Sequence, residues 1–195
     1  MLYKILRWIG KPVVYLLFFP RIIGKNNSRI KGKAVVISNH LSMWDPLLIA
    51  VIIRRQIFWM GKAELFKSRI ASLFFKAMKA FPVRRGEGDL AAIRHAFRVL
   101  RDGKLFGIFP EGTRIKSKDI SRFEPGTAMI ALKNDAPVLP IYIKGNYKLF
   151  RRMKVIIGNP IHLADYVGTK TDTATVEAAS RFLEDKLIDL RNTMF

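Results

Sequence analysis

The chain of 195 residues contains no cysteine and few acidic side chains. Without a thiol, it can form neither disulfides nor the thiolate nucleophiles and metal ligands that depend on cysteine. The histidines are His40, His95 and His162, and their separation does not give the close spacing of a histidine metal site. We therefore expect neither a metal nor a bound cofactor.

The shortage of acidic residues leaves a large positive charge. Thirty-five Lys and Arg face fifteen Asp and Glu, which gives a formal net charge of +20. The cations that precede the first acidic residue, Asp45, are Lys4, Arg7, Lys11, Arg21, Lys25, Arg29, Lys31 and Lys33. Such a surface favours an anionic partner, which could be a nucleic acid, a lipid headgroup or an acidic protein.

The N-terminus has no uncharged run long enough to span a bilayer. Residues 12–20 are uncharged, but Lys11 and Arg21 bracket them, and a spanning helix needs roughly 20 apolar residues. Apolar residues recur at helical spacing before that run, at Leu2, Ile5, Leu6 and Ile9. We therefore expect residues 1–30 to form two short amphipathic helices, divided at Gly10 and Pro12, that lie on an anionic membrane.

Two other interpretations of the N-terminus are an ordinary pair of core helices and a secretory signal peptide. A signal peptide shares the basic start and the short apolar run, but no small-residue cleavage site follows. Membrane contact accounts best for the apolar face and the cations together.

The rest of the chain, residues 31–195, alternates between strand and helix patterns. Strands are predicted over residues 34–38, 57–60, 81–83, 105–109, 138–143 and 154–157, and helices over 45–53, 68–79, 90–100, 126–134 and about 176–190. This alternation predicts a single α/β domain with a mixed sheet and helices on both faces. In such folds, functional residues lie beyond the carboxyl ends of the strands.

The first candidate site follows the strand predicted at 34–38. His40 lies just past the strand end, and Asp45 opens a helix five residues later. A loop of this length allows the carboxylate to meet one imidazole nitrogen, which leaves the other to act as a general base. The alternative is that Asp45 only caps the helix and His40 is an ordinary loop residue.

The second candidate site follows the strand predicted at 105–109. A Pro-Glu-Gly turn at residues 110–112 leads to Arg114, and arginine binds phosphate in a bidentate manner. The alternative is a local ion pair between Glu111 and Arg114 in a surface turn.

Together these segments resemble the glycerolipid acyltransferase family. Four of its sequence blocks occur in order, at residues 39–45 (N-H-x-x-x-x-D), 79–85, 109–114 (F-P-E-G-T-R) and 136–141. The resemblance covers about residues 33–145, and the N-terminal segment resembles the family's membrane-docking element. One departure is Lys79, where the second block usually opens with Gly.

The resemblance implies an O-acyltransferase on the cytoplasmic face of the membrane, peripheral or monotopic. His40, oriented by Asp45, would deprotonate the free hydroxyl of a lysophospholipid such as lysophosphatidic acid. That hydroxyl would attack an acyl thioester of acyl carrier protein or coenzyme A directly and give phosphatidic acid. The residues implied to hold the acceptor phosphate are Arg85, Glu111, Gly112, Thr113 and Arg114. An acceptor such as glycerol-3-phosphate or another lysophospholipid would also suit such a site.

Direct transfer agrees with the residues themselves, because the chain has no cysteine and no G-x-S-x-G nucleophile elbow. Two other functions stay open. Gly86, Gly88 and Ala91 match the dinucleotide-binding pattern, with Glu111 near the expected acidic position, although Glu87 and Asp89 lie where a pyrophosphate would dock. The charge also permits a non-enzymatic nucleic-acid binder, but no nucleic-acid-binding motif is visible and we expect no nucleic-acid partner.

Overall fold

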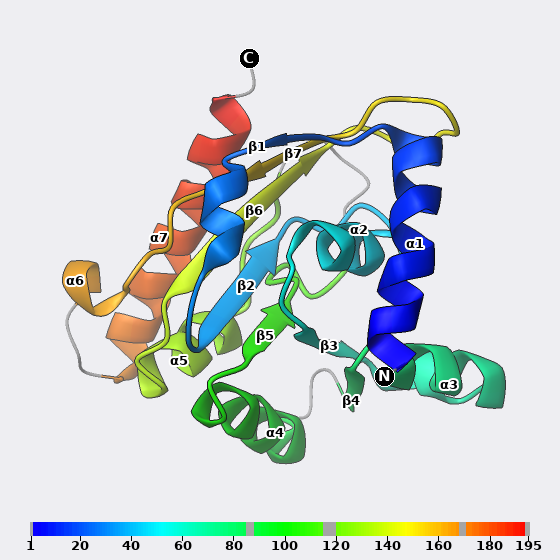
Figure 1. Cartoon of the computed structure of the whole chain (residues 1–195). Helices are drawn as coiled ribbons and strands as arrows, with labels where there is room; N and C mark the ends of the chain where they lie inside the picture. Colours follow the sequence, from blue (N-terminus) through cyan, green and yellow to red (C-terminus); the bar gives the residue numbers. More distant parts are fainter. Residues whose placement is uncertain (1, 85–87, 115–119, 168–170, 194–195) are drawn as a thin grey trace.

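The computed structural model describes residues 2–84, 88–114, 120–167 and 171–193, and its centre is a seven-stranded sheet (Figure 1). The strands are β1 (Arg21–Ile23), β2 (Ala34–Ser38), β3 (Ile57–Lys62), β4 (Ala80–Val83), β5 (Leu105–Ile108), β6 (Val138–Lys144) and β7 (Lys154–Ile157). Their spatial order is β1-β7-β6-β2-β5-β3-β4, and neighbours are parallel except for the antiparallel pair β6 and β7. The predicted mixed α/β sheet is confirmed.

Helices pack on both faces of this sheet. They are α1 (Leu2–Phe18), α2 (Asp45–Ile52), α3 (Arg69–Ala77), α4 (Leu90–Arg101), α5 (Gly126–Lys133), α6 (Ala164–Val167) and α7 (Thr173–Asn192), with 3-10 turns η1 (Lys25–Arg29) and η2 (Ala63–Phe66). Successive side chains of a strand point to opposite faces. Val35 and Ile37 of β2 accordingly face α4, α5 and α7, whereas Val36 packs with α1 and α2.

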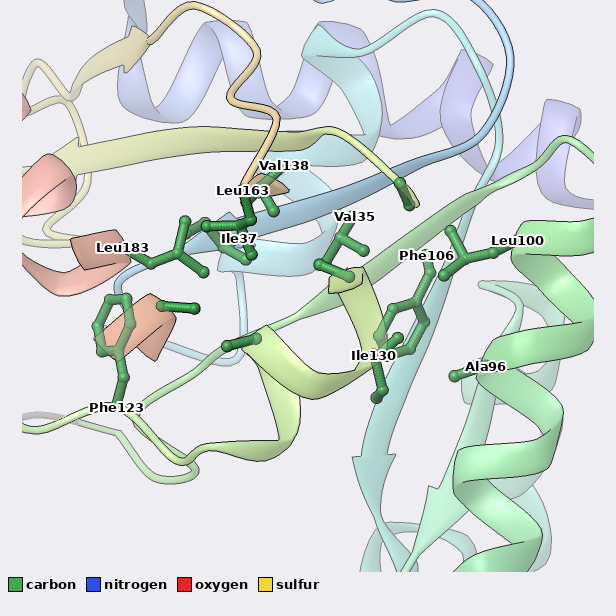
Figure 2. Close-up of a cluster of buried hydrophobic side chains, with 14 of the residues drawn as sticks. Val35, Ile37, Ala96, Leu100, Phe106, Phe123, Ile130, Val138, Leu163 and Leu183 are labelled. Carbon is green, nitrogen blue, oxygen red and sulfur yellow. The ribbon is translucent and has the colours of Figure 1, made fainter. Parts of the chain in front are cut away.

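Figure 2 shows the core beneath α4, α5 and α7. Val35 and Phe106 from the sheet lie near Leu100 of α4 and Ile130 of α5, and Ile37 of β2 lies beside Leu183 of α7. Each of these side chains is at most 2% exposed. Helices α4 and α7 fold as predicted because each presents one apolar stripe to the sheet.

The prediction of two short N-terminal helices was wrong. Residues 2–18 form one continuous helix that includes Gly10 and Pro12. Gly10 allows close packing on α2, since a Cβ there would lie 3.0 Å from Leu47 Cδ1. Proline in a helix removes a backbone hydrogen bond, at a cost of about 3 kcal/mol, and the burial of Val14 and Phe18 against the sheet offsets this cost.

Among the described residues, no helix is both long enough and apolar enough to cross a bilayer. After Phe18 the chain reverses at Phe19, whose φ of 40° lies in the left-handed region, and then enters β1. The sequence pattern did not reveal β1, because three residues are too short to show alternation. This strand pairs with β7, so the first 30 residues add both a helix and an edge strand to the domain.

Candidate active site

The parallel strands β2, β3 and β5 end at one edge of the sheet, where the chain after β2 carries His40 and the chain after β5 carries Phe109. Asn39 anchors the first of these loops. Its side chain donates to the carbonyl of Ile143 at 2.9 Å and accepts from the N–H of Ile143 at 2.8 Å. The amide therefore extends the pairing of β2 with β6 by one residue and holds His40 at the strand end.

His40 and Asp45 form a hydrogen-bonded pair, as the motif predicts. Nδ1 of His40 lies 2.7 Å from Oδ2 of Asp45, which is fully buried. The same oxygen accepts the backbone N–H groups of Leu41 and Ser42, each at 2.7 Å. The short loop is therefore folded around the carboxylate, and only Nε2 of His40 is left to exchange a proton with a substrate.

A third residue, which no sequence motif indicated, also contacts Asp45. The hydroxyl of Tyr147, in the loop between β6 and β7, donates to Oδ1 of Asp45 at 2.5 Å. Burial raises the pKa of the Tyr147 phenol, and the charge of Asp45 raises it further, so Tyr147 stays a donor at all ordinary pH values. Its ring also meets Phe18 of α1 edge-on at 5.1 Å. A separation of 102 residues from Asp45 left no sequence signal for this contact.

Glu111 lies on the other side of His40. Its Oε2 accepts the backbone N–H of His40 at 3.1 Å, and the residue is only 5% exposed. Burial raises the pKa of Glu111 to about 7. The N–H groups of His40 and Ser121 oppose this rise, and the charges of Asp45 and Glu184 add to it. Glu111 does not form the alternative local ion pair with Arg114 in a surface turn. Its side chain is buried against the His40 loop, whereas Arg114 is exposed.

A cavity of about 240 Å³ opens beside His40. Thr113 and Arg114 line it together with His40, and most of its remaining wall is apolar, including Leu47, Leu65, Phe74, Phe75 and Met78. The ring of Phe109 stacks on His40 at 4.0 Å and on Trp59 at 5.2 Å. The imidazole is therefore held between an apolar wall and a cationic rim.

A second cavity, of about 530 Å³, also borders Phe109. Glu111, Gly112 and Thr113 line it, together with Arg84 at the end of β4. Gly112 has a φ of 67°, a conformation that favours glycine, and it turns the chain from Glu111 to Thr113. Arg85, the predicted phosphate ligand of this block, lies outside the described residues.

The sequence profile of the acyltransferase family matches residues 20–144, which include the pair, both cavities and the sheet edge that carries them. The chain belongs to the acyltransferase family. It is 31% identical over 180 residues to a 1-acyl-sn-glycerol-3-phosphate acyltransferase of Bacillus subtilis, a match that covers 89% of each chain. It is also 29% identical over 140 residues to the Borreliella burgdorferi protein of the same name, covering 71% of this chain and 55% of that one. The chain is therefore an acyltransferase enzyme of the type these relatives represent.

A solved structure shows the same fold. The 1-acyl-sn-glycerophosphate (LPA) acyltransferase PlsC of Thermotoga maritima superimposes with a TM-score of 0.72 at 22% sequence identity, covering 97% of this chain and 79% of that one. The arrangement of sheet and helices described above is thus an acyltransferase fold.

Lys79, where the acyltransferase block usually has Gly, sits between α3 and β4. Its φ is 60°, in the left-handed region that costs most L-residues roughly 1–2 kcal/mol. Its N–H donates to the carbonyl of Lys76 at 3.0 Å and closes the end of α3. A glycine would adopt this conformation without strain, whereas the lysine adopts it under strain.

The dinucleotide pattern falls partly outside the described residues, since Gly86 and Glu87 are not among them. Asp89 caps α4, and its Oδ1 accepts the N–H groups of Ala91 and Ala92 at 3.1 and 3.0 Å. A carboxylate therefore already occupies the helix N-terminus where a pyrophosphate would bind. Among the described residues, no group of three His, Asp or Glu side chains is placed to hold a metal ion.

Proposed function

We propose that this acyltransferase moves a fatty acyl group from a thioester of acyl carrier protein or coenzyme A to the free hydroxyl of lysophosphatidic acid, giving phosphatidic acid. The observation that carries the proposal is the hydrogen-bonded pair of His40 and Asp45 on the wall of a cavity that also holds Thr113 and Arg114. A general base, an anion-binding rim and an apolar chamber are the three parts that this transfer requires. The names of the relatives support the same acceptor.

In the proposed reaction, Nε2 of His40 takes the proton of the acceptor hydroxyl as its oxygen attacks the thioester carbonyl carbon. A C–O ester bond forms, the C–S bond breaks, and the leaving thiolate takes the proton from the imidazolium. Asp45 holds Nδ1–H and stabilises the imidazolium while it exists. A base of this kind contributes about 10²–10⁴ in rate.

We propose that Thr113 and Arg114 hold the acceptor phosphate, together with Arg85 and the turn at Glu111 and Gly112. Arg114 lines the same cavity as His40, so a glycerol phosphate bound there would bring its hydroxyl toward the imidazole. A guanidinium binds phosphate through parallel hydrogen bonds. The apolar wall of the cavity, which includes Leu65 and Phe75, suits an acyl chain.

We further propose that α1 docks the enzyme on the cytoplasmic face of an anionic membrane. One side of the helix, with Tyr3, Val14 and Phe18, is buried. Another side leaves apolar residues exposed, and these are Leu2, Ile5, Ile9 and Leu16, at 49%, 43%, 51% and 63%. Exposed cations accompany them at Lys4 and Lys11. An apolar face of this kind with nearby cations is typical of a helix that lies in the membrane interface.

The decisive experiment compares wild type with His40→Ala in acyl transfer to lysophosphatidic acid, using acyl-coenzyme A and acyl carrier protein donors. We expect phosphatidic acid from wild type and a rate at least about 10²-fold lower in the variant. His162→Ala is the matched control, because it removes an exposed histidine from the segment between β7 and α6.

Equal rates in wild type and a folded His40→Ala variant would contradict the proposed mechanism. If wild type itself is inactive on lysophosphatidic acid, activity on glycerol-3-phosphate or another lysophospholipid would replace the proposed acceptor while keeping the base.

A further inference from the structure

Helix α3 carries its apolar residues outward. Of its nine residues only Ala77 is buried. Ile70, Leu73 and Phe74 lie at i, i+3 and i+4, so they share one face of the helix, and they are 83%, 67% and 45% exposed. A helix that belonged only to the core would turn this face inward, because each such side chain gains roughly 1.5–3 kcal/mol on burial.

The exposed face of α3 is continuous with the catalytic cavity. Phe74 belongs to the exposed stripe and also lines the cavity beside His40. Leu47 lines the same cavity and packs beneath α1, against Tyr3. Helices α1 and α3 are in contact, and in Figure 1 α3 lies beside the N-terminal end of α1. An apolar path therefore runs from the outer surface of α3, past Phe74, to the imidazole.

The charge around the exposed apolar face of α3 indicates what kind of surface would cover it. Residues 67–79 contain no acidic side chain, and the exposed cations among them are Lys67, Arg69, Lys76 and Lys79. A second copy of this chain would bring another surface from a protein of net charge +20 against these cations. An anionic lipid surface instead offers apolar chains to the stripe and phosphates to the cations.

We propose that α3 is a second interfacial helix, inserted in an anionic bilayer beside α1, so that the cavity opens at the level of the lipid acyl chains. Lipid substrate then passes from the bilayer past Phe74 to His40 without its chains crossing water. The inference rests on the proposed function, which supplies a lipid substrate and docking through α1. Its own content is the placement of α3.

Because the chain has no cysteine, one engineered thiol carries one fluorophore. We would attach an environment-sensitive nitrobenzoxadiazole probe to Leu73→Cys in α3, Ile9→Cys in α1 and Leu90→Cys in α4. Leu90 is the matched control, since it is 66% exposed, against 67% for Leu73, and starts a helix on the opposite face of the sheet. With vesicles of phosphatidylglycerol and phosphatidylcholine, we expect a blue shift and a severalfold gain in emission at 73 and 9, and neither change at 90.

The possible outcomes separate the two proposals. A probe that responds at 9 but not at 73 would overturn the role of α3 and leave docking through α1 intact. A response at 73 without vesicles, growing with protein concentration, would show that a second copy covers α3 and would also overturn it. No response at any position would contradict both docking proposals. Acyl transfer by wild type to a short-chain, monomeric lysophosphatidic acid tests the chemistry separately.

A pair of charge substitutions provides a second measurement. Leu73→Glu places a carboxylate in the proposed interface, and Leu90→Glu makes the same change at equal exposure elsewhere. We expect vesicle affinity to fall by about tenfold or more for Leu73→Glu and by less than about twofold for Leu90→Glu. Equal vesicle affinities of the two folded variants would overturn the inference.

Discussion

The first and last helices of the chain differ in how far their apolar residues are buried. Helix α7 buries its apolar stripe, in which Ala179, Leu183 and Leu187 are fully inaccessible to solvent. Helix α1 packs against α2 and buries Val14 and Phe18, yet Ile9 and Leu16 remain more than half exposed. Folding of this chain therefore accounts for the pattern of α7 completely and for that of α1 only in part. The proposed docking of α1 on a membrane would account for the remainder.

A pair of truncations tests this contrast most strongly. Leu187→Ala should lower the free energy of unfolding by about 2–5 kcal/mol, because it opens a cavity in a closed core. Leu16→Ala, in α1, should change it by less than about 0.5 kcal/mol, because the side chain is 63% exposed. Urea unfolding measures both values. Vesicle binding should reverse the order and weaken only for Leu16→Ala. Equal losses of stability would show that α1 is an ordinary core helix.

Helix α7 also affects the candidate site electrostatically. It carries Glu184, whose negative charge helps to raise the pKa of the buried Glu111. The pKa of Glu111 rises from 4.5 to about 7 on folding. The folded state then binds more protons at Glu111 than the unfolded state between these values, so the contribution of Glu111 to stability is greatest below pH 4.5 and is lost as the pH rises through 7. The total loss is up to about 3 kcal/mol.

Glu111→Gln should remove this pH dependence and be the more stable protein at pH 8, with little difference from wild type at pH 4. Unfolding in urea across this range gives the slope. Glu177→Gln, an exposed carboxylate of α7, is the control and should keep the slope of wild type. An unchanged slope in Glu111→Gln would mean that Glu111 is ionised in the folded protein at pH values well below 7.

Helix α1 is also linked to the His40–Asp45 pair through Tyr147, since Phe18 contacts Tyr147 and Tyr147 donates to Asp45. Tyr147→Phe keeps the ring and removes the donor, which leaves more negative charge on Asp45 to stabilise the His40 imidazolium. We expect kcat to fall by about tenfold and the acidic limb of the pH–rate profile to move to higher pH. The pH dependence of kcat distinguishes this effect from loss of structure, which lowers the rate without moving the limb. Tyr15→Phe, on α1, should change neither.

The smallest expected effect concerns two helix ends on opposite sides of the sheet. The turn that follows α4 has Gly103 with a φ of 69°, whereas the turn that follows α3 has Lys79 with a φ of 60°. Lys79→Gly should relieve the left-handed strain and raise the free energy of unfolding by up to about 1 kcal/mol, since part of the gain is lost to the freer unfolded chain. Thermal denaturation would detect the change, and a destabilised variant would contradict it.

Residues whose roles depend on near neighbours could be predicted from the sequence. The spacing of five positions from His40 to Asp45 predicted their contact, and the apolar periodicity of α4 and α7 predicted their packing. Contacts between residues far apart in the chain have no local sequence pattern from which they could be predicted. Tyr147 meets Asp45 only because β6 and β2 are neighbours in the sheet, and β1 exists only because β7 offers it an edge.

Local chemistry along the chain was thus enough to predict the α/β class, the acyltransferase blocks and the contact of His40 with Asp45. The tertiary structure decided that Gly10 packs against Leu47 within one continuous helix, and that the apolar stripe of α3 faces outward. The physical reason is that periodicity shows only that a helix has an apolar face. The packing of neighbouring elements determines whether that face meets the core or remains available to a membrane.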